Sequence, residues 1–310
     1  MLGMRLFRLR IAALVILIII VSVLLWLLIP LHPSARKNTL YGRAYITGVV
    51  RVKPLLEKPF SSIVSAIPGN PTTAGNVPFF LRPLIPPVME FYLQGSKEGD
   101  GWAIVADLGW RSKLFRMLHG VIIGQMQYRG MGAIEGEYVL RTPSGTRILF
   151  YQDGGTLFFA EGENVIERII GPDIITGHNT DRADLQKSAP ETGDDRVITS
   201  VSFSNIDGDV TKAIEMIEGR AGFMLMPSAG SMIKGSVDLR QAGSDTISGM
   251  ITLVSRDDGD VEGLEGDITY IITLLERFLY AQNMKTDITI NREESKITAQ
   301  IMIHPEGGKQ

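Results

Sequence analysis

The sequence contains no cysteine among its 310 residues. Disulfides, thiolate nucleophiles and Cys-ligated metals are therefore excluded, and cysteine usage cannot indicate the redox compartment. Histidine is also sparse: the four residues lie far apart, and none has the H-x-x-x-H or H-E-x-x-H spacing of a zinc site. No G-x-x-x-x-G-K-[ST] or helix-opening G-x-G-x-x-G motif is present, so nothing cradles the phosphates of a nucleotide.

Acidic residues are absent from the first 40 positions. All 34 lie later, whereas five of the 31 Lys and Arg residues lie before residue 40. The remaining 26 basic and 34 acidic side chains give the body of the chain a net charge of −8. This sign disfavours nucleic acid as a partner, because phosphate binding needs a basic surface.

Residues 11–29, IAALVILIIIVSVLLWLLI, are a 19-residue apolar run with Ser22 as its one polar side chain. As a helix at ~1.5 Å per residue the run spans roughly 28 Å, about the thickness of the hydrocarbon layer of a bilayer. We expect a retained transmembrane helix, because the apolar part of a cleaved signal peptide is shorter and HPSA is a poor cleavage site. Arg5, Arg8 and Arg10 precede the run without an acid, which predicts an N-terminus inside. The expected location is the bacterial inner membrane, single-pass, with the C-terminal region in the periplasm or outside.

Behind this helix, the pattern predicts an extracytoplasmic α+β region of two related lobes of mixed or antiparallel sheet with packed helices. Alternating β-branched stretches predict strands, and apolar residues at helical spacing predict helices over DVTKAIEMIEGR and residues 261–282. The expected strands lie at residues 42–52, 102–107, 137–141, 146–151, 157–160, 197–205, 223–226, 236–240 and 247–255, with a closing hairpin at 286–303. The predicted organisation is a basic cytoplasmic tail (1–10), an anchor (11–30), a stalk (31–40), a first lobe (41–175) with a proline-rich insertion (68–90), a polar linker (176–196), a second lobe (197–304) and a tail (305–310).

A strand followed by an acid, a glycine and a helix recurs four times. The stretches are ADLGWRSKLF, AEGENVIERI, NIDGDVTKAI and RDDGDVEGLE. Acids and Asn at a helix start cap free amides and suit the helix dipole, so the recurrence favours construction over four active sites. It also hints at a duplicated α+β unit. The alternative is an anchored envelope hydrolase, in which two of Asp107, Glu161, Asp207 and Asp258 act as acid and base on a glycoside.

Asp258, Asp260 and Glu262 stand at alternate positions, with Gly263 sixth, as in the first half of an EF-hand loop. The twelfth position is Thr269 instead of a bidentate Glu. A weak calcium site in an adhesion module is therefore a further alternative, and no other cofactor is expected.

Two surfaces are candidates for contact with a partner or with the membrane. The first lies in the proline-rich insertion, where an apolar group favours either a loop packed over its own core or an exposed patch. Its members are Phe79, Phe80, Leu81, Leu84 and Ile85. The second is a helix face with Lys113 and Arg116, which suits lipid headgroups or an acidic partner.

The anchor, the acidic folded exterior and the lack of converging catalytic groups predict a non-catalytic envelope protein. Its exported region is expected to bind a protein partner or to self-associate, as a scaffold or an assembly subunit.

Overall fold

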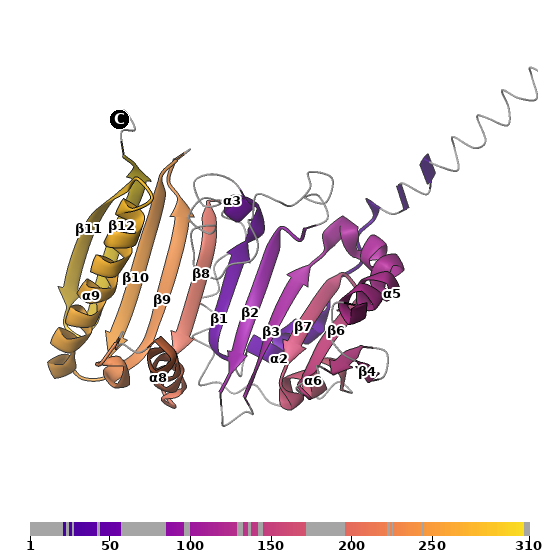
Figure 1. The fold of residues 1–310 in the computed structure, drawn as a ribbon, viewed down its shortest axis with the longest axis horizontal. Helices are drawn as coiled ribbons and strands as arrows, with labels where there is room; N and C mark the ends of the chain where they lie inside the picture. Colours follow the sequence, from indigo (N-terminus) through magenta and orange to yellow (C-terminus); the bar gives the residue numbers. More distant parts are fainter. Residues whose placement is uncertain are drawn as a thin grey trace, which may run out of the picture.

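The computed structural model describes residues 21–22, 25–26, 28–41, 44–56, 85–95, 100–128, 133–135, 138–141, 145–171, 196–221, 224, 226–243 and 245–306. These residues form an α+β fold around one large antiparallel sheet (Figure 1). The sheet has 12 strands in the order β11-β12-β10-β9-β8-β1-β2-β3-β7-β6-β5-β4. The prediction of an α+β region with antiparallel sheet and packed helices is therefore confirmed.

The first half of the sheet ends at the β4 edge. Its strands are β1 (Ala44–Arg51), β2 (Val88–Gln94), β3 (Gly101–Asp107), β4 (Ala133–Glu135), β5 (Val139–Arg141), β6 (Arg147–Asp153) and β7 (Thr156–Glu161). Its helices are η1 (Ala35–Lys37), α2 (Asn38–Tyr41), α3 (Val52–Leu56), η5 (Gly109–Arg111), α5 (Ser112–Tyr128) and α6 (Glu163–Ile170).

The second half ends at the β11 edge. Its strands are β8 (Val197–Ser204), β9 (Met232–Gln241), β10 (Ile247–Ser255), β11 (Met284–Glu293) and β12 (Lys296–Pro305). Its helices are α8 (Asp209–Ala221), η7 (Ala229–Ser231), η8 (Asp258–Asp260) and α9 (Val261–Tyr280).

The five strands nearest the centre of the sheet have the same order in both halves, and the first half continues beyond them with β5 and β4. The order is β1-β2-β3-β7-β6 in the first half and β8-β9-β10-β12-β11 in the second. β1 and β8 pair antiparallel from Ile46–Phe203 to Val50–Thr199 and so join both halves into one sheet. The halves are thus connected through backbone pairing as well as through the chain between them.

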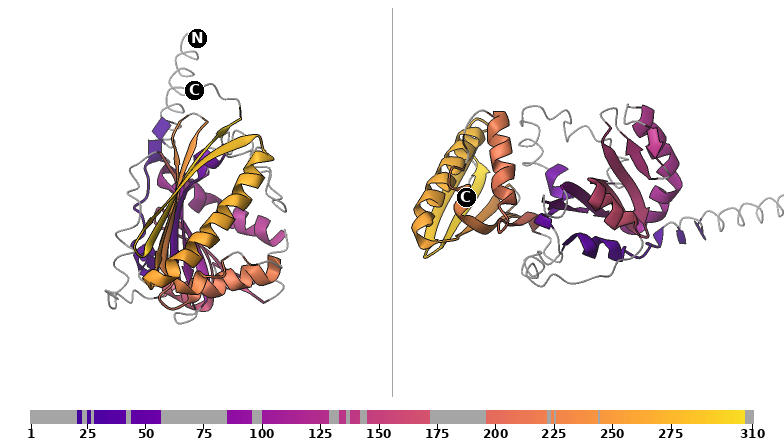
Figure 2. Two further views of the ribbon diagram at one scale, coloured as in Figure 1. Left: turned by 90° about the vertical axis from the view of Figure 1, so that its left-hand side faces the viewer. Right: turned by 90° about the horizontal axis from the view of Figure 1, so that it is seen from below.

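Strand register shows which helices share a face of the sheet. One row of neighbouring residues runs from Phe159, which packs in the α5 cluster, to Ala299, which packs in the α9 cluster. Side chains of directly paired residues lie on the same face, so α5 and α9 cover the same face. The row is Phe159, Ile104, Phe91, Gly48, Val201, Val237, Ile251 and Ala299. Figure 2 shows these helices on one side of the sheet, with α2 on the other.

The opposite face changes character between the halves. In the first half it is apolar, and Leu40 together with Val165, Ile166 and Ile169 of α6 packs onto it. In the second half this face is more polar. Paired residues on it include Ser200, Asp238, Gln300 and Thr289. This part bears an open hollow of about 470 Å³ that includes Asp238, Arg240, Met250, Asp287, Gln300 and Met302.

Residues 31–40, for which the sequence predicted a stalk, lie against the first half of the sheet. Leu40 is fully buried there, and η1 and α2 contact α6. The predicted strand at 223–226 is also different: Met224 and Met226 lie in irregular chain before η7. β2 was not predicted, because six prolines between residues 68 and 87 indicated extended or turning chain up to its start.

Among the residues that the structure describes, no helix is long and apolar enough to cross a membrane. Most of the predicted span, namely residues 11–20, 23, 24 and 27, lies outside those residues. The transmembrane helix therefore stays a prediction.

Candidate functional site

The segment 31–41 connects the end of the apolar run to the folded body through backbone hydrogen bonds. The amide of Leu31 donates to Ser112 Oγ at 3.0 Å, and the amide of Ser34 donates to Thr156 Oγ1 at 2.9 Å. The amide of Gly155 donates to the carbonyl of His32 at 2.7 Å. A Cβ on Gly155 would lie 2.4 Å from the carbonyl oxygen of Leu31, so only glycine permits this approach. The first residues after the apolar run are thus fixed to α5 and to the β6–β7 turn.

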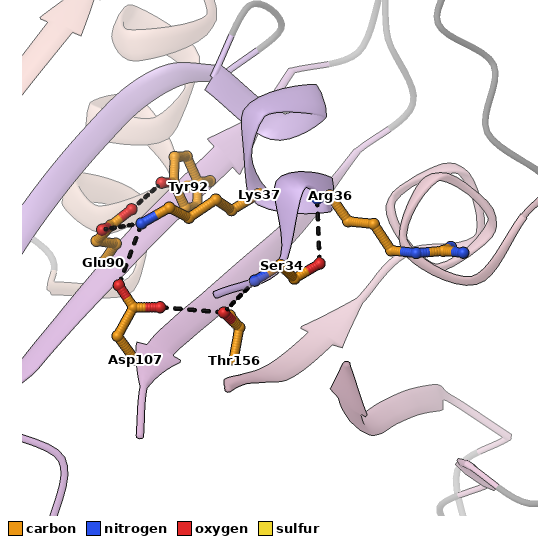
Figure 3. Close-up of polar contacts among 7 residues, drawn as sticks. All are labelled: Ser34, Arg36, Lys37, Glu90, Tyr92, Asp107 and Thr156. Atoms are coloured by element: carbon orange, nitrogen blue, oxygen red, sulfur yellow. Dashed lines mark hydrogen bonds and ion pairs between the residues drawn. The ribbon is translucent and has the colours of Figure 1, made fainter. Parts of the chain in front are cut away.

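Lys37 places a cation between two carboxylates of the sheet (Figure 3). Its Nζ lies 3.3 Å from Glu90 Oε1 on β2 and 3.2 Å from Asp107 Oδ2 at the end of β3. The phenol of Tyr92 donates to the other oxygen of Glu90, and Thr156 Oγ1 donates to Asp107 Oδ1 at 3.0 Å. The Glu90 side chain is only 9% exposed, so its charge is compensated within the protein.

The amine of Lys37 in this cluster is not available as a nucleophile or a base. Burial lowers the pKa of Lys37, but the charges of Glu90 and Asp107 outweigh it, and the pKa lies above the ordinary value of 10.5. A lysine held as a cation at neutral pH is neither a nucleophile nor a general base. The arrangement instead docks the segment 31–41 onto the sheet.

Arg36 completes this docking at the end of α6. Its Nη1 donates to the carbonyls of Ile169 and Gly171, and its Nε lies 3.4 Å from Asp153 Oδ2. A cation at a helix C-terminus satisfies free carbonyls and suits the helix dipole. The sequence did not indicate a contact of the folded body for Arg36 or Lys37.

Lys113 also lies beside the end of the apolar run. Its Nζ lies 4.3 Å from the centroid of the Trp26 ring and 2.6 Å from the Trp26 carbonyl oxygen. Arg116, the other predicted residue of this face, is exposed one turn further along α5. Next to these cations α5 exposes apolar side chains, with Met117 66% and Val121 63% exposed.

The four strand-end carboxylates do not surround one cleft. Asp107 and Glu161 lie at opposite ends of the β3–β7 pair, since Asp107 pairs with Thr156 and Trp102 with Glu161. Glu161 Oε2 accepts from Trp102 Nε1 at 2.9 Å. Asp207 and Asp258 follow β8 and β10, and β9 lies between those strands.

Asp258, Asp260 and Glu262 do not gather into the predicted calcium loop. The first two form the exposed turn η8, and Glu262 lies in the first turn of α9. Side chains two positions apart on a helical turn do not face each other, so the three carboxylates diverge. Within the described part of the chain, no three His, Asp or Glu side chains form a possible metal site. Asn205 does cap as expected: its Oδ1 accepts from the amide of Thr211 in α8 at 3.1 Å.

The predicted apolar surface falls mostly outside the described residues. Phe79, Phe80, Leu81 and Leu84 are not among them, and Ile85 is half-buried just before β2. Glu90 and Tyr92 belong to the Lys37 cluster, and sequence reasoning missed both. The signal for them was the alternation in VMEFYLQ, which puts Glu90, Tyr92 and Gln94 on one face of a strand.

Comparisons with protein families and with curated proteins found no match. Among solved structures, two crystal forms of TP0453 are similar to this chain, each with a TM-score of 0.44. One is 10% identical and covers 86% of this chain and 93% of its own, and the other is 9% identical with 88% and 94% covered. A likeness at this level does not bear on what the chain does.

Proposed function

We propose that the chain is a non-catalytic, single-pass protein of the bacterial inner membrane, with its N-terminus inside. In this proposal the body lies in the periplasm or outside and acts as a scaffold or assembly subunit for a protein partner or for further copies. The observation that carries the proposal is the docked segment after the apolar run. A cleavable leader needs no fixed geometry at its end, whereas a permanent tether gains from one.

The exposed end of the apolar run supports a lipid environment around it. Leu25, Trp26, Leu28 and Ile29 are each more than half exposed, so the folded body does not cover them. A Trp ring with a Lys ammonium above it is an arrangement that suits a bilayer interface, where one side is apolar and the other wet.

The exposed side of α5 lies beside this point. Its apolar residues, Met117 and Val121, would reach the acyl boundary, while Lys113 and Arg116 would meet lipid phosphates. We further propose that the two halves are related lobes of a duplicated unit, which the shared strand order supports.

Membrane fractionation tests the anchor. The full chain is expected to stay in the pellet after alkaline carbonate washing, and a periplasm-dependent reporter fused to the C-terminus is expected to be active. A variant with Val15→Arg and Ile19→Arg in the predicted span should move to the supernatant, because each Arg costs about 2.5–3.5 kcal/mol at a helix centre. As a control, Met216→Arg on the exposed side of α8 should change nothing. A wild-type chain released by carbonate, or a reporter active only in the cytosol, would contradict the proposal.

A further inference from the structure

The sheet ends on one side in a long strand with a free edge. β11 has ten residues and pairs along its whole length with β12, from Met284–Pro305 to Glu293–Lys296. β11 is the last strand in the order, and Figure 1 shows it at the outer margin of the sheet. Every second residue of an edge strand directs its N–H and C=O outward, so within the described residues these groups of β11 meet no neighbouring strand. The other edge, β4, has only three residues.

Two of the devices that block such an edge, a proline and a bulge, are missing from β11, and its charged side chains are of both signs. The sequence MKTDITINRE has no proline, and its register with β12 runs without a bulge. Ile288 and Ile290 are half-buried on the α9 side of this edge. Long, regular and partly apolar edges are the ones that accept another strand.

We propose that the β11 edge pairs with β11 of a second copy of this chain, antiparallel, with Thr289 facing Thr289 across a two-fold axis. This register opposes Lys285 to Glu293 of the second copy, and it does so twice. It also opposes Ile288 to Ile290 on the α9 side. The inference rests on the proposed function, to which it adds the partner and the surface.

Other registers fit less well. A shift by one residue would oppose side chains of opposite faces, which the pleat forbids. With Ile288 on the axis, Lys285 would face Asn291 and would lose its contact with the carboxylate of Glu293. With Ile290 on the axis, Asp287 would face Glu293, and like charges directly opposite are destabilising.

The neighbouring charges extend the same complementarity. Glu293 pairs in register with Lys296, so Lys285 of the second copy would continue an alternating row. Within its own chain Lys285 lies 3.5 Å from Glu306, and both are exposed enough to admit a second partner. On the α9 side, Thr286 Oγ1 donates to Glu276 at 3.1 Å, and Arg292 of the second copy would lie opposite Thr286, beside that carboxylate.

A single-cysteine scan tests the register, and the absence of native cysteine makes the readout clean. In membranes containing the full chain, Thr289→Cys is expected to form a disulfide-linked dimer on mild oxidation. Residues facing each other across an antiparallel pair have Cα atoms roughly 4.5–5.5 Å apart, within the disulfide range. The matched controls are Asp287→Cys and Asn291→Cys on the same face. Each alone should stay monomeric, whereas the two co-expressed should crosslink to each other.

Charge reversal supplies a second readout, because rescue by the reciprocal substitution distinguishes a loss of pairing from a loss of folding. Lys285→Glu in the Thr289→Cys background should lower the crosslinked fraction roughly tenfold, and adding Glu293→Lys should restore it. Equal crosslinking at 287, 289 and 291 would mean random collision and overturn the pairing. No dimer at 289, in a sample whose chain still resists carbonate, would refute the pairing alone and leave the proposed anchor intact. A dimer at 289 in a chain that carbonate releases would support the pairing and contradict the proposed anchor.

Discussion

At the scale of single residues, the docking of the segment 31–41 depends on the cation of Lys37. Replacing it in Lys37→Met keeps the length of the side chain but removes the cation that lies beside the buried carboxylate of Glu90 and beside Asp107. Because Lys37 is 23% and Asp107 40% exposed, we expect a loss of about 2 kcal/mol in the free energy of unfolding, below the value for a fully buried pair. Urea denaturation of the full chain in detergent measures it.

The control for this prediction is Lys234→Met, at an exposed position on β9. It should change the free energy of unfolding by no more than about 0.5 kcal/mol. If the two variants were equally stable, the ion pairs of Lys37 would contribute nothing to docking.

The pH dependence of the same difference follows from the raised pKa of Lys37. A cation whose folded-state pKa lies above its unfolded value of 10.5 stabilises fully below that value. Its contribution is lost as the pH rises through the folded-state pKa. The stability difference between wild type and Lys37→Met should therefore be constant from about pH 7 to 9 and shrink only above about 10.5. A difference that already falls between pH 7 and 9 would contradict the assignment.

At the scale of elements, α5 has one apolar side that is packed on the sheet and one that is exposed. Ile123 packs with Leu140 and Phe150 on the sheet, while Met117 and Val121 point away from it. With a cysteine and an environment-sensitive dye at position 117 or 121, the full chain in lipid vesicles should show blue-shifted emission. Spin-labelled lipids should quench it, because the proposed orientation places this side at the acyl boundary.

The matched control is the dye at position 216 on α8, where Met216 is 56% exposed. It should emit as in water and resist quenching by the lipid probe. Equal quenching at positions 117, 121 and 216 would show that the dye itself partitions into lipid, and no quenching at 117 and 121 would remove α5 from the membrane surface.

Elements with strong local periodicity could be predicted from the sequence. β10 begins and ends where the alternation of residues 247–255 placed it, and α8, α9 and the β11–β12 hairpin follow the same rule. β2 could not be predicted, because the prolines before it indicate extended or turning chain up to its start. The charged cluster is harder still: Lys37 lies 53 residues from Glu90 and 70 from Asp107 in sequence, so only the fold brings them together. Acids at helix starts are visible in the local sequence and therefore attracted functional hypotheses. The structure does not bring these acids together into one site.

At the scale of the whole molecule, the seam between β1 and β8 determines whether the two halves behave as one body. Five residues of each strand pair there, and Tyr45, Ile46 and Leu55 of the first half pack against the core of the second. We therefore expect the two halves to stay together without the chain between them.

Cutting the chain between the halves tests that claim. With a protease site inserted in the polar segment 176–195, the cleaved protein should still elute as one particle from a sizing column in detergent, because the paired strands and the apolar contacts remain. Ser202 pairs with Thr47, and alternation along β8 directs its amide to β1, because Asn205 three residues later bonds to β9. Ser202→Pro removes this donor from the seam and should let the cleaved fragments separate, whereas Ser202→Ala, which keeps the amide, should not. Circular dichroism of the uncut Ser202→Pro chain shows whether each half is still folded. Fragments of the cleaved wild type that elute apart would mean that the covalent link, and not the sheet, joins the two halves.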